Sequence, residues 1–187
     1  MPTAAKHTAS NRRTAAKGAS ARAGKDDAIK LLKADHKEVS EMVEKFENGR
    51  LSKDRKVATA KQICMALTVH AQIEEEIFYP AIERQLGTEG ATLITEARKE
   101  HTEMKRAMSK LRASEFAGPE GARLLQEMMK GVQHHVQEEE SELLPTAQQQ
   151  LGGELERLGN QMQQRKQEVQ HTKLRPGSQE RVVRRND

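Results

Sequence analysis

The chain contains the pattern His-x-x-x-Glu twice on its apolar stripes, at His70 and His135, and a lone histidine stands 34 residues before each of these two histidines. In a helix, residues four apart lie on one face, so each copy presents an imidazole and a carboxylate to the same point. All of these residues fall on apolar stripes. A buried carboxylate costs several kcal/mol unless it is paired or binds a cation, and imidazole is a common metal ligand. The predicted metal ligands are His36, His70, Glu74, His101, His135 and Glu139.

A shift of 65 residues superimposes the two halves of this pattern, including acidic neighbours and Pro80 with Pro145. The 65-residue shift also distinguishes two adjacent His-x-x-x-Glu pairs. His134 and Glu138 have the same spacing as His135 and Glu139, but they lie off the apolar stripe. Two facing copies would supply four nitrogen and two oxygen donors. Two bridging carboxylates with terminal imidazoles suit two metal ions about 3.5–4 Å apart. Proline interrupts helical hydrogen bonding, so we expect the helix to bend at each proline, over the site.

The elements that must position these residues are helices, because apolar residues recur at steps of three and four. Nothing alternates with period two over the length of a strand. We therefore predict an all-α fold, an antiparallel up-down-up-down four-helix bundle over residues 26–152 made of two repeated hairpins. A short, weakly apolar fifth helix over 153–170 is expected to cap an end of the bundle or to mediate association. The four predicted bundle helices span 26–48, 53–86, 89–114 and 119–151.

The composition excludes several classes of protein. Aromatic residues make up 2% of the chain, which disfavours single-strand nucleic-acid modules that stack bases on aromatic rings. The single cysteine, Cys64, excludes an intramolecular disulfide framework and a cysteine-rich zinc site. No apolar run approaches the roughly 20 residues that span a bilayer, and no apolar region of a signal peptide follows the N-terminus. We expect a cytoplasmic protein without a membrane segment.

The net charge of +4 is unevenly distributed. Residues 1–25 carry +6 and residues 171–187 carry +3, which leaves −5 for residues 26–170. Both tails contain few large apolar residues, so we predict that they are disordered. The N-terminal tail has three interpretations: a solubilising segment, a polybasic arm that binds nucleic-acid phosphates non-specifically, or an organelle transit peptide.

These motifs resemble the hemerythrin-like, or HHE cation-binding, family. The resemblance rests on HxxxEE followed by FYP at 70–80, HxxxEE followed by LLP at 135–145, and the histidines of DH at 35–36 and EH at 100–101. It covers about residues 26–152. It implies a four-helix bundle that holds a carboxylate-bridged, non-haem centre of two iron ions and meets O₂ or related molecules. The six predicted ligands would hold these ions, with Glu74 and Glu139 as the bridges.

One position departs from the oxygen-carrying members of this family, which have a second histidine one turn after the third-helix histidine. Lys105 stands there. The site would have an open position, or a further donor from Glu75, Tyr79, Glu103 or Glu140. Lys105 is either a donor to a bound oxygen species or a solvated lysine. An open position favours reaction with peroxide or NO over reversible O₂ carriage.

Three functions are consistent with the sequence. The first is a di-iron protein that binds or reduces O₂, peroxide or NO in a protective or sensing role against oxidative stress, with turnover left open. The second is an iron-binding, sensing or storage-like module without turnover, docked on nucleic acid by its basic tails. The third is a structural bundle with one zinc ion, since histidine and glutamate also accept zinc, and manganese is a further alternative metal. The oligomeric state is not predicted.

Overall fold

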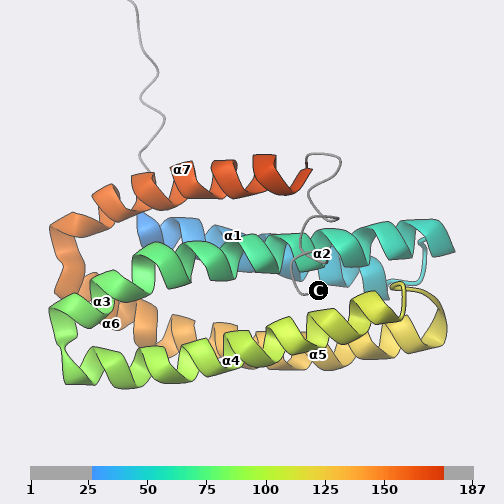
Figure 1. Ribbon diagram of the computed structural model, residues 1–187, viewed down its shortest axis with the longest axis horizontal. Coiled ribbons are helices and arrows are strands. Elements are labelled where there is room, and N and C mark those ends of the chain that lie inside the picture. The colour runs from blue at the N-terminus through green and yellow to red at the C-terminus, as the bar shows by residue number, and fades with distance from the viewer. Residues whose placement is uncertain (1–26, 175–187) are drawn as a thin grey trace, which may run out of the picture.

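The computed structural model describes residues 27–174, so the predictions for the tail at 1–25 and for residues 175–187 lie outside the described part. The first hairpin begins with helix α1 (Ala28–Glu47). Helix α2 (Lys53–Ile73) follows and runs without interruption through a π-helical turn, η1 (Glu74–Phe78), into α3 (Tyr79–Leu86). Figure 1 shows these elements along the upper part of the bundle.

The second hairpin repeats this arrangement. Helix α4 (Thr88–Ala113) is followed by α5 (Gly118–Glu138), which continues through a second π-helical turn, η2 (Glu139–Leu143), into α6 (Leu144–Leu151). The described part of the chain contains helices and no strand. The predicted all-α, antiparallel four-helix bundle is confirmed, and its four long helical spans are the predicted ones.

Each π-helical turn lies where the sequence predicts a bend. Pro80 and Pro145 are the second residues of α3 and α6, directly after the two turns. A proline has no N–H to donate to the preceding turn. Just before each proline, a backbone hydrogen bond spans five residues in place of the usual four. These bonds run from Tyr79 N–H to the Glu74 carbonyl and from Leu144 N–H to the Glu139 carbonyl. Inserted π-turns are frequent at functional sites, and both begin at a predicted bridging glutamate.

The core divides into two hydrophobic clusters, and the predicted ligands lie between them. On α1, Leu32 belongs to one cluster and Val39 to the other, with His36 in between. On α4, Ala97 and Met104 flank His101 in the same way. The bundle therefore holds its ionisable residues in a buried layer between two apolar ones, where an unpaired charge is costly.

The fifth helix is longer than predicted and lies elsewhere. Helix α7 (Leu155–Leu174) follows a short 3₁₀ turn, η3 (Gly152–Glu154). It contacts α1 and α2 and runs lengthwise beside them, as Figure 1 shows, so the expectation of an end cap is wrong. Leu158 and Met162 fill the first core cluster. Apolar residues on one face of this polar helix are sufficient to anchor it along the bundle.

Within residues 27–174, no helix is both long and apolar enough to cross a membrane.

Candidate metal centre

The structure brings all six predicted ligands together. Each of these residues lies on a different helical turn, and each is buried, with at most 6% of its surface exposed. Helices α1, α2, α4 and α5 each supply one histidine, and the two π-helical turns supply the glutamates. Possible ligand atoms of His36, His70, Glu74 and Glu139 lie within 4.8 Å of one another, as do those of Glu74, His101 and His135.

Each glutamate faces one histidine of its own hairpin and one of the other hairpin. Glu74 Oε2 lies 3.2 Å from His70 Nε2 and 3.3 Å from His101 Nε2. Glu139 Oε2 lies 3.3 Å from His36 Nε2 and 3.8 Å from His135 Nε2. The 65-residue repeat therefore appears in space as a twofold arrangement, with each carboxylate placed between two imidazoles.

The other ring nitrogen of each histidine faces outward, toward a carboxylate. Three of these Nδ1 atoms form hydrogen bonds of 2.8 Å, and the fourth is 3.7 Å from its carboxylate. A carboxylate at Nδ1 keeps the proton there and leaves the Nε2 lone pair for a metal ion. The pairs are His36 with Glu140, His101 with Glu75, His135 with Glu100, and His70 with Asp35.

These outer carboxylates revise two sequence-based expectations. Glu75 and Glu140 were candidates for an additional metal ligand. Both instead accept hydrogen bonds from a histidine of the opposite hairpin. The signal was present in the sequence, because Glu75 and Glu140, like Asp35 and Glu100, are related by the 65-residue shift. Glu103, a third candidate, is exposed.

Lys105 neither faces the centre nor extends freely into solvent. Its Nζ donates to both oxygens of Glu75, at 2.6 and 2.7 Å. Glu75 in turn accepts from His101 Nδ1. These two contacts hold the pKa of Glu75 down at about 2, since the hydrogen bond with His101 and that with Lys105 outweigh the partial burial of the group. Lys105 therefore acts on the centre through Glu75 and His101.

Tyr79, the fourth candidate donor, lies inside the centre. Its side chain is fully buried, and its hydroxyl donates to Glu139 Oε1 at 2.9 Å. The Tyr79 hydroxyl oxygen also lies 3.4 Å from Glu74 Oε2 and 3.4 Å from His101 Nε2. Burial raises the pKa of Tyr79, and the charges of the two glutamates raise it further. The phenol therefore keeps its proton. The position related to it by the repeat is Leu144, so only one side of the centre has this donor.

The pKa shifts of the buried residues favour a bound cation at the centre. Burial raises the pKa of Glu74, and repulsion from Glu139 adds to it. Burial lowers the pKa of His70 to about 4, so its ring is neutral and its lone pair is available. Burial opposes a charge on His36 as well, but contact with Glu139 outweighs this and raises the pKa of His36 to about 9. Metal binding would displace that proton, which makes affinity depend on pH.

Unsatisfied buried atoms support the same conclusion. Among the described residues, His36 Nε2, both ring nitrogens of His70, Glu74 Oε1 and Glu139 Oε2 are buried and have no hydrogen-bond partner. Buried polar atoms are normally satisfied by a protein group, a water molecule or an ion. Four of these five atoms, all except His70 Nδ1, belong to the inward-facing groups of the centre, which fits a bound metal ion. The donor set itself, imidazole with carboxylate, suits first-row transition metals.

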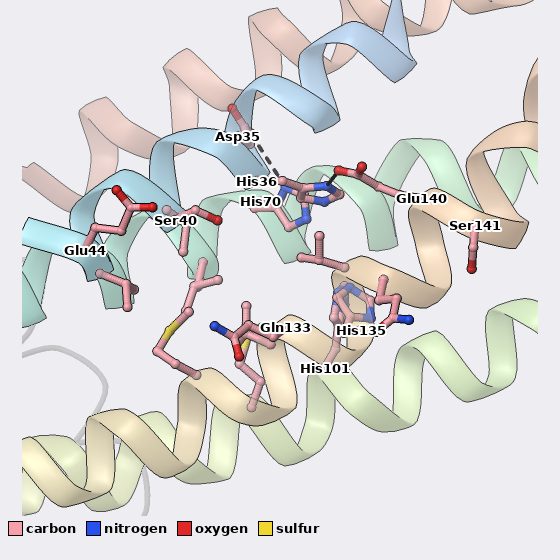
Figure 2. A pocket seen from close by; sticks show the side chains of 18 of the residues that line it. Asp35, His36, Ser40, Glu44, His70, His101, Gln133, His135, Glu140 and Ser141 are labelled. Carbon is pink, nitrogen blue, oxygen red and sulfur yellow. Dashed lines mark hydrogen bonds and ion pairs between the residues drawn. The ribbon is translucent and has the colours of Figure 1, made fainter. Parts of the chain in front are cut away.

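A cavity of about 570 Å³ between α1 and α5 reaches the centre. Figure 2 shows His36, His70, His101 and His135 gathered at it. Its walls are largely apolar, and four carboxylates, those of Asp35, Glu44, Glu47 and Glu140, line it beside the histidines of the centre. Apolar walls and these carboxylates favour neutral small molecules over anions.

Comparison with known proteins identifies the family. The hemerythrin HHE cation-binding domain matches residues 27–147, well over half of the chain. The chain therefore belongs to the hemerythrin HHE cation-binding domain family. An uncharacterized hemerythrin-like protein of Schizosaccharomyces pombe is 29% identical over 111 residues, which cover 58% of this chain and 55% of that protein.

Two further proteins are similar to this chain over different shares of their length. A Nostoc protein named DNA nickase is 36% identical over 93 residues, 50% of this chain and 26% of that protein. The chain thus spans about half or less of the curated relatives it matches. The crystal structure of a hemerythrin HHE cation-binding domain-containing protein from Mycobacterium kansasii superimposes with a TM-score of 0.69 at 22% identity, covering 80% of this chain and 90% of that one. This likeness shows a shared fold.

Proposed function

We propose that this chain is a non-haem di-iron protein that binds or reacts with O₂, peroxide or NO at the buried centre, in a protective or sensing role. The observation that supports the proposal most is the position of the two glutamates. Each lies between imidazoles of opposite hairpins, at 3.2–3.8 Å, as a bridging carboxylate between two metal ions would. The predicted ligands are His36, His70, Glu74, His101, His135 and Glu139.

The surrounding residues support reaction at this centre. Two bound iron ions would supply redox chemistry and a binding place for small oxygen or nitrogen species. Three outer carboxylates accept hydrogen bonds from Nδ1 of His36, His101 and His135, which orients these imidazoles and keeps their protons on Nδ1. Tyr79 holds a proton at its hydroxyl within the centre. The largely apolar cavity between α1 and α5 would admit a neutral small molecule to the centre.

The test is to reconstitute the full chain with ferrous iron anaerobically and then add O₂, peroxide or NO in separate experiments. We expect visible charge-transfer bands to appear with at least one of them. The chain has no tryptophan, so near-ultraviolet bands will stand above a weak protein absorbance. Glu139→Ala should lose iron and the bands together. A parent protein that holds iron but shows no spectral change with any of the three would contradict the proposed reactivity.

A second function is favoured by the charge distribution. We propose that the basic tails, taken as residues 1–25 and 175–187 because α7 extends to Leu174, dock the metal-binding domain on nucleic acid without sequence preference. A similarity to a protein named DNA nickase is in line with this, although it covers 26% of that protein. The proposal predicts DNA binding that weakens steeply with salt and disappears when both tails are deleted. Binding that survives the deletion would contradict it.

A further inference from the structure

The two hairpins each form a cavity beside the centre, and the two cavities are related by the 65-residue repeat. One lies against α1, α2 and α7 and has a volume of about 340 Å³. The other lies between α4 and α5 and has a volume of about 210 Å³. Asp35 lines the first and Glu100 the second, at equivalent positions, and each carboxylate also faces the Nδ1 atom of a predicted ligand. The chain therefore contains two versions of one pocket.

Helix α7 forms part of the wall of the first pocket and supplies it with a positive charge. Lys166 of α7 forms an ion pair with Asp35, and both side chains are mostly buried, at 17% and 9% exposure. Val69 lines this pocket, and Ile73, one turn further along α2, is buried in the core, at 1% and 0% exposure. On this side, the outer carboxylate of the centre is thus neutralised by a cation that belongs to the protein.

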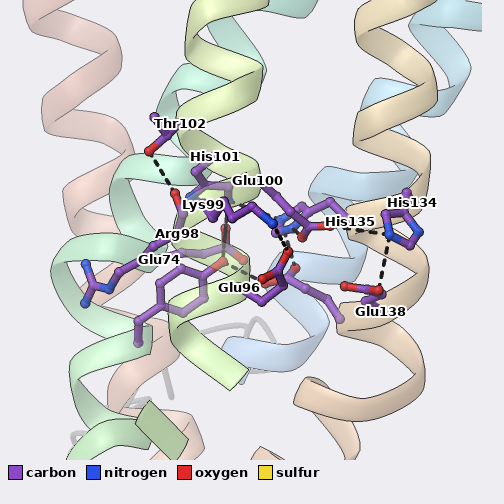
Figure 3. A network of polar contacts seen from close by, with 12 residues as sticks. Glu74, Glu96, Arg98, Lys99, Glu100, His101, Thr102, His134, His135 and Glu138 are labelled. Carbon is purple, nitrogen blue, oxygen red and sulfur yellow. Dashed lines mark hydrogen bonds and ion pairs between the residues drawn. The ribbon is translucent and has the colours of Figure 1, made fainter. Parts of the chain in front are cut away.

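No residue of α7 lines the second pocket, and the equivalent positions carry metal-ligating groups. His134 stands where the first hairpin has Val69, and Glu138 stands where it has Ile73. His134 Nε2 lies 3.2 Å from Glu138 Oε1 and 3.7 Å from Glu100 Oε1. Figure 3 shows the three side chains together, with His135 behind Glu100. Their possible ligand atoms all lie within 4.8 Å of one another.

Within residues 27–174, no lysine or arginine forms an ion pair with Glu100 or Glu138. Lys99, the residue before Glu100, donates instead to Glu96 at 2.8 Å. By contrast, Asp35 forms an ion pair with Lys166. The second pocket therefore has the ligands for a cation, near the place equivalent to the one that the Lys166 ammonium occupies in the first pocket.

We propose that His134, Glu138 and Glu100 form an outer site for a divalent transition-metal ion, and that ions destined for the buried centre are captured there. An imidazole with two carboxylates is a donor set that such ions accept. The cavity beside the outer site is also lined by His101 and His135, two predicted ligands of the centre, so the outer site and the centre lie on the two sides of the same histidines. The capture role rests on the proposed metal centre, whereas the outer site stands on its own geometry.

The outer site is tested by counting manganese ions on the metal-loaded full chain. Mn²⁺ is suitable because it is the weakest competitor in the usual affinity order and will not displace ions already bound inside. Free Mn²⁺ is measured from its electron paramagnetic resonance signal. The test variant is His134→Gln combined with Glu138→Gln, two side chains that are 65% and 45% exposed. Glu100 is left unchanged because it also holds His135.

We expect the parent to bind one more Mn²⁺ per chain than the double variant. Loss of an outer-shell partner costs about 10–100-fold in metal affinity, so loss of two direct ligands should weaken the outer site by about 100-fold or more. Glu41→Gln, an exposed carboxylate on α1 that pairs with Lys37, is the matched control and should bind as the parent does. Equal Mn²⁺ binding by the parent and the double variant would overturn the outer site.

The capture role is tested by the rate at which metal-free full chain takes up ferrous iron anaerobically. The double variant should reach the same final iron content as the parent but at least about tenfold more slowly, because capture precedes entry. Equal rates would overturn the capture role. If neither protein takes up iron at the centre, the proposed function fails, and the Mn²⁺ difference still decides whether the outer site exists.

Discussion

Replacing Glu75 by glutamine should weaken metal binding at a centre that Glu75 does not itself enter. Its Oε1 lies 2.8 Å from His101 Nδ1, and Lys105 holds both of its oxygens. Glutamine keeps the size and one acceptor oxygen but removes the negative charge that keeps the proton on Nδ1 and makes Nε2 a stronger ligand. Changes to such partners cost about 10–100-fold in metal affinity, which corresponds to about 1.4–2.7 kcal/mol.

The lower end of this range is expected for Glu75→Gln, since the amide oxygen still accepts the hydrogen bond. We therefore predict about a tenfold loss of affinity, measured by competition with a chelator of known strength. Glu76→Gln is the matched control, because Glu76 is the next residue on the same π-helical turn but pairs with Arg165 of α7 at 2.6 Å. Equal affinities for the two variants would refute the argument that the outer carboxylates tune the ligands.

Three further predictions concern stability and domain boundaries. Lys166→Met leaves the Asp35 carboxylate buried without its ion-pair partner and should lower the free energy of unfolding by about 3 kcal/mol. Lys99→Met, which removes an exposed ion pair with Glu96, should lower it by less than about 1 kcal/mol. Equal losses for the two variants in denaturant titrations would contradict the argument. Burial raises the pKa of Cys64 from 9.0 to about 11. The unfolded chain therefore loses this proton at a lower pH, and the free energy of unfolding should fall between about pH 9 and pH 11 more in the parent than in Cys64→Ala; parallel pH profiles would show otherwise. Deletion of residues 1–25 should leave metal content unchanged, and loss of metal on elemental analysis would place the domain boundary elsewhere.

The repeat explains why the site was predictable. Ionisable residues on an apolar stripe are individually ambiguous, but the same arrangement at a constant offset of 65 residues selects His135 over its neighbour His134. Helical periodicity then converts that selection into positions on a bundle, because inward faces of antiparallel helices must meet. The described residues confirm that these side chains share one buried layer.

The outer carboxylates could not be placed by the same reasoning. Glu75 and Glu140 follow their ligand glutamates by one residue, about 100° around the helix, where periodicity predicts a solvated side chain. Their partners, His101 and His36, belong to the opposite hairpin, so the contact depends on how the hairpins are docked. The repeat hinted at them, since equivalent positions shared an acidic residue, but did not specify what they bind.

The position of α7 was missed for a related reason. Its sequence is polar, and only a few apolar residues, such as Leu158 and Met162, mark the side that is buried. Those residues predict that the helix packs against the bundle, but they do not specify which bundle helices it covers. Two ion pairs, Lys166 with Asp35 and Arg165 with Glu76, join it to the first hairpin. The lengthwise arrangement is thus a tertiary property, which a periodicity argument on one segment does not contain.

The most direct test of the metal centre is elemental analysis of metal per chain, on protein produced in iron-replete medium, with His70→Ala and Leu125→Ala beside it. Leu125 is buried in the second core cluster and is not a predicted ligand, so its replacement destabilises the bundle without removing a donor. We predict two iron ions per chain in the parent and in Leu125→Ala, and fewer in His70→Ala. A single zinc ion in the parent, or equal metal content in the parent and His70→Ala, would contradict the account.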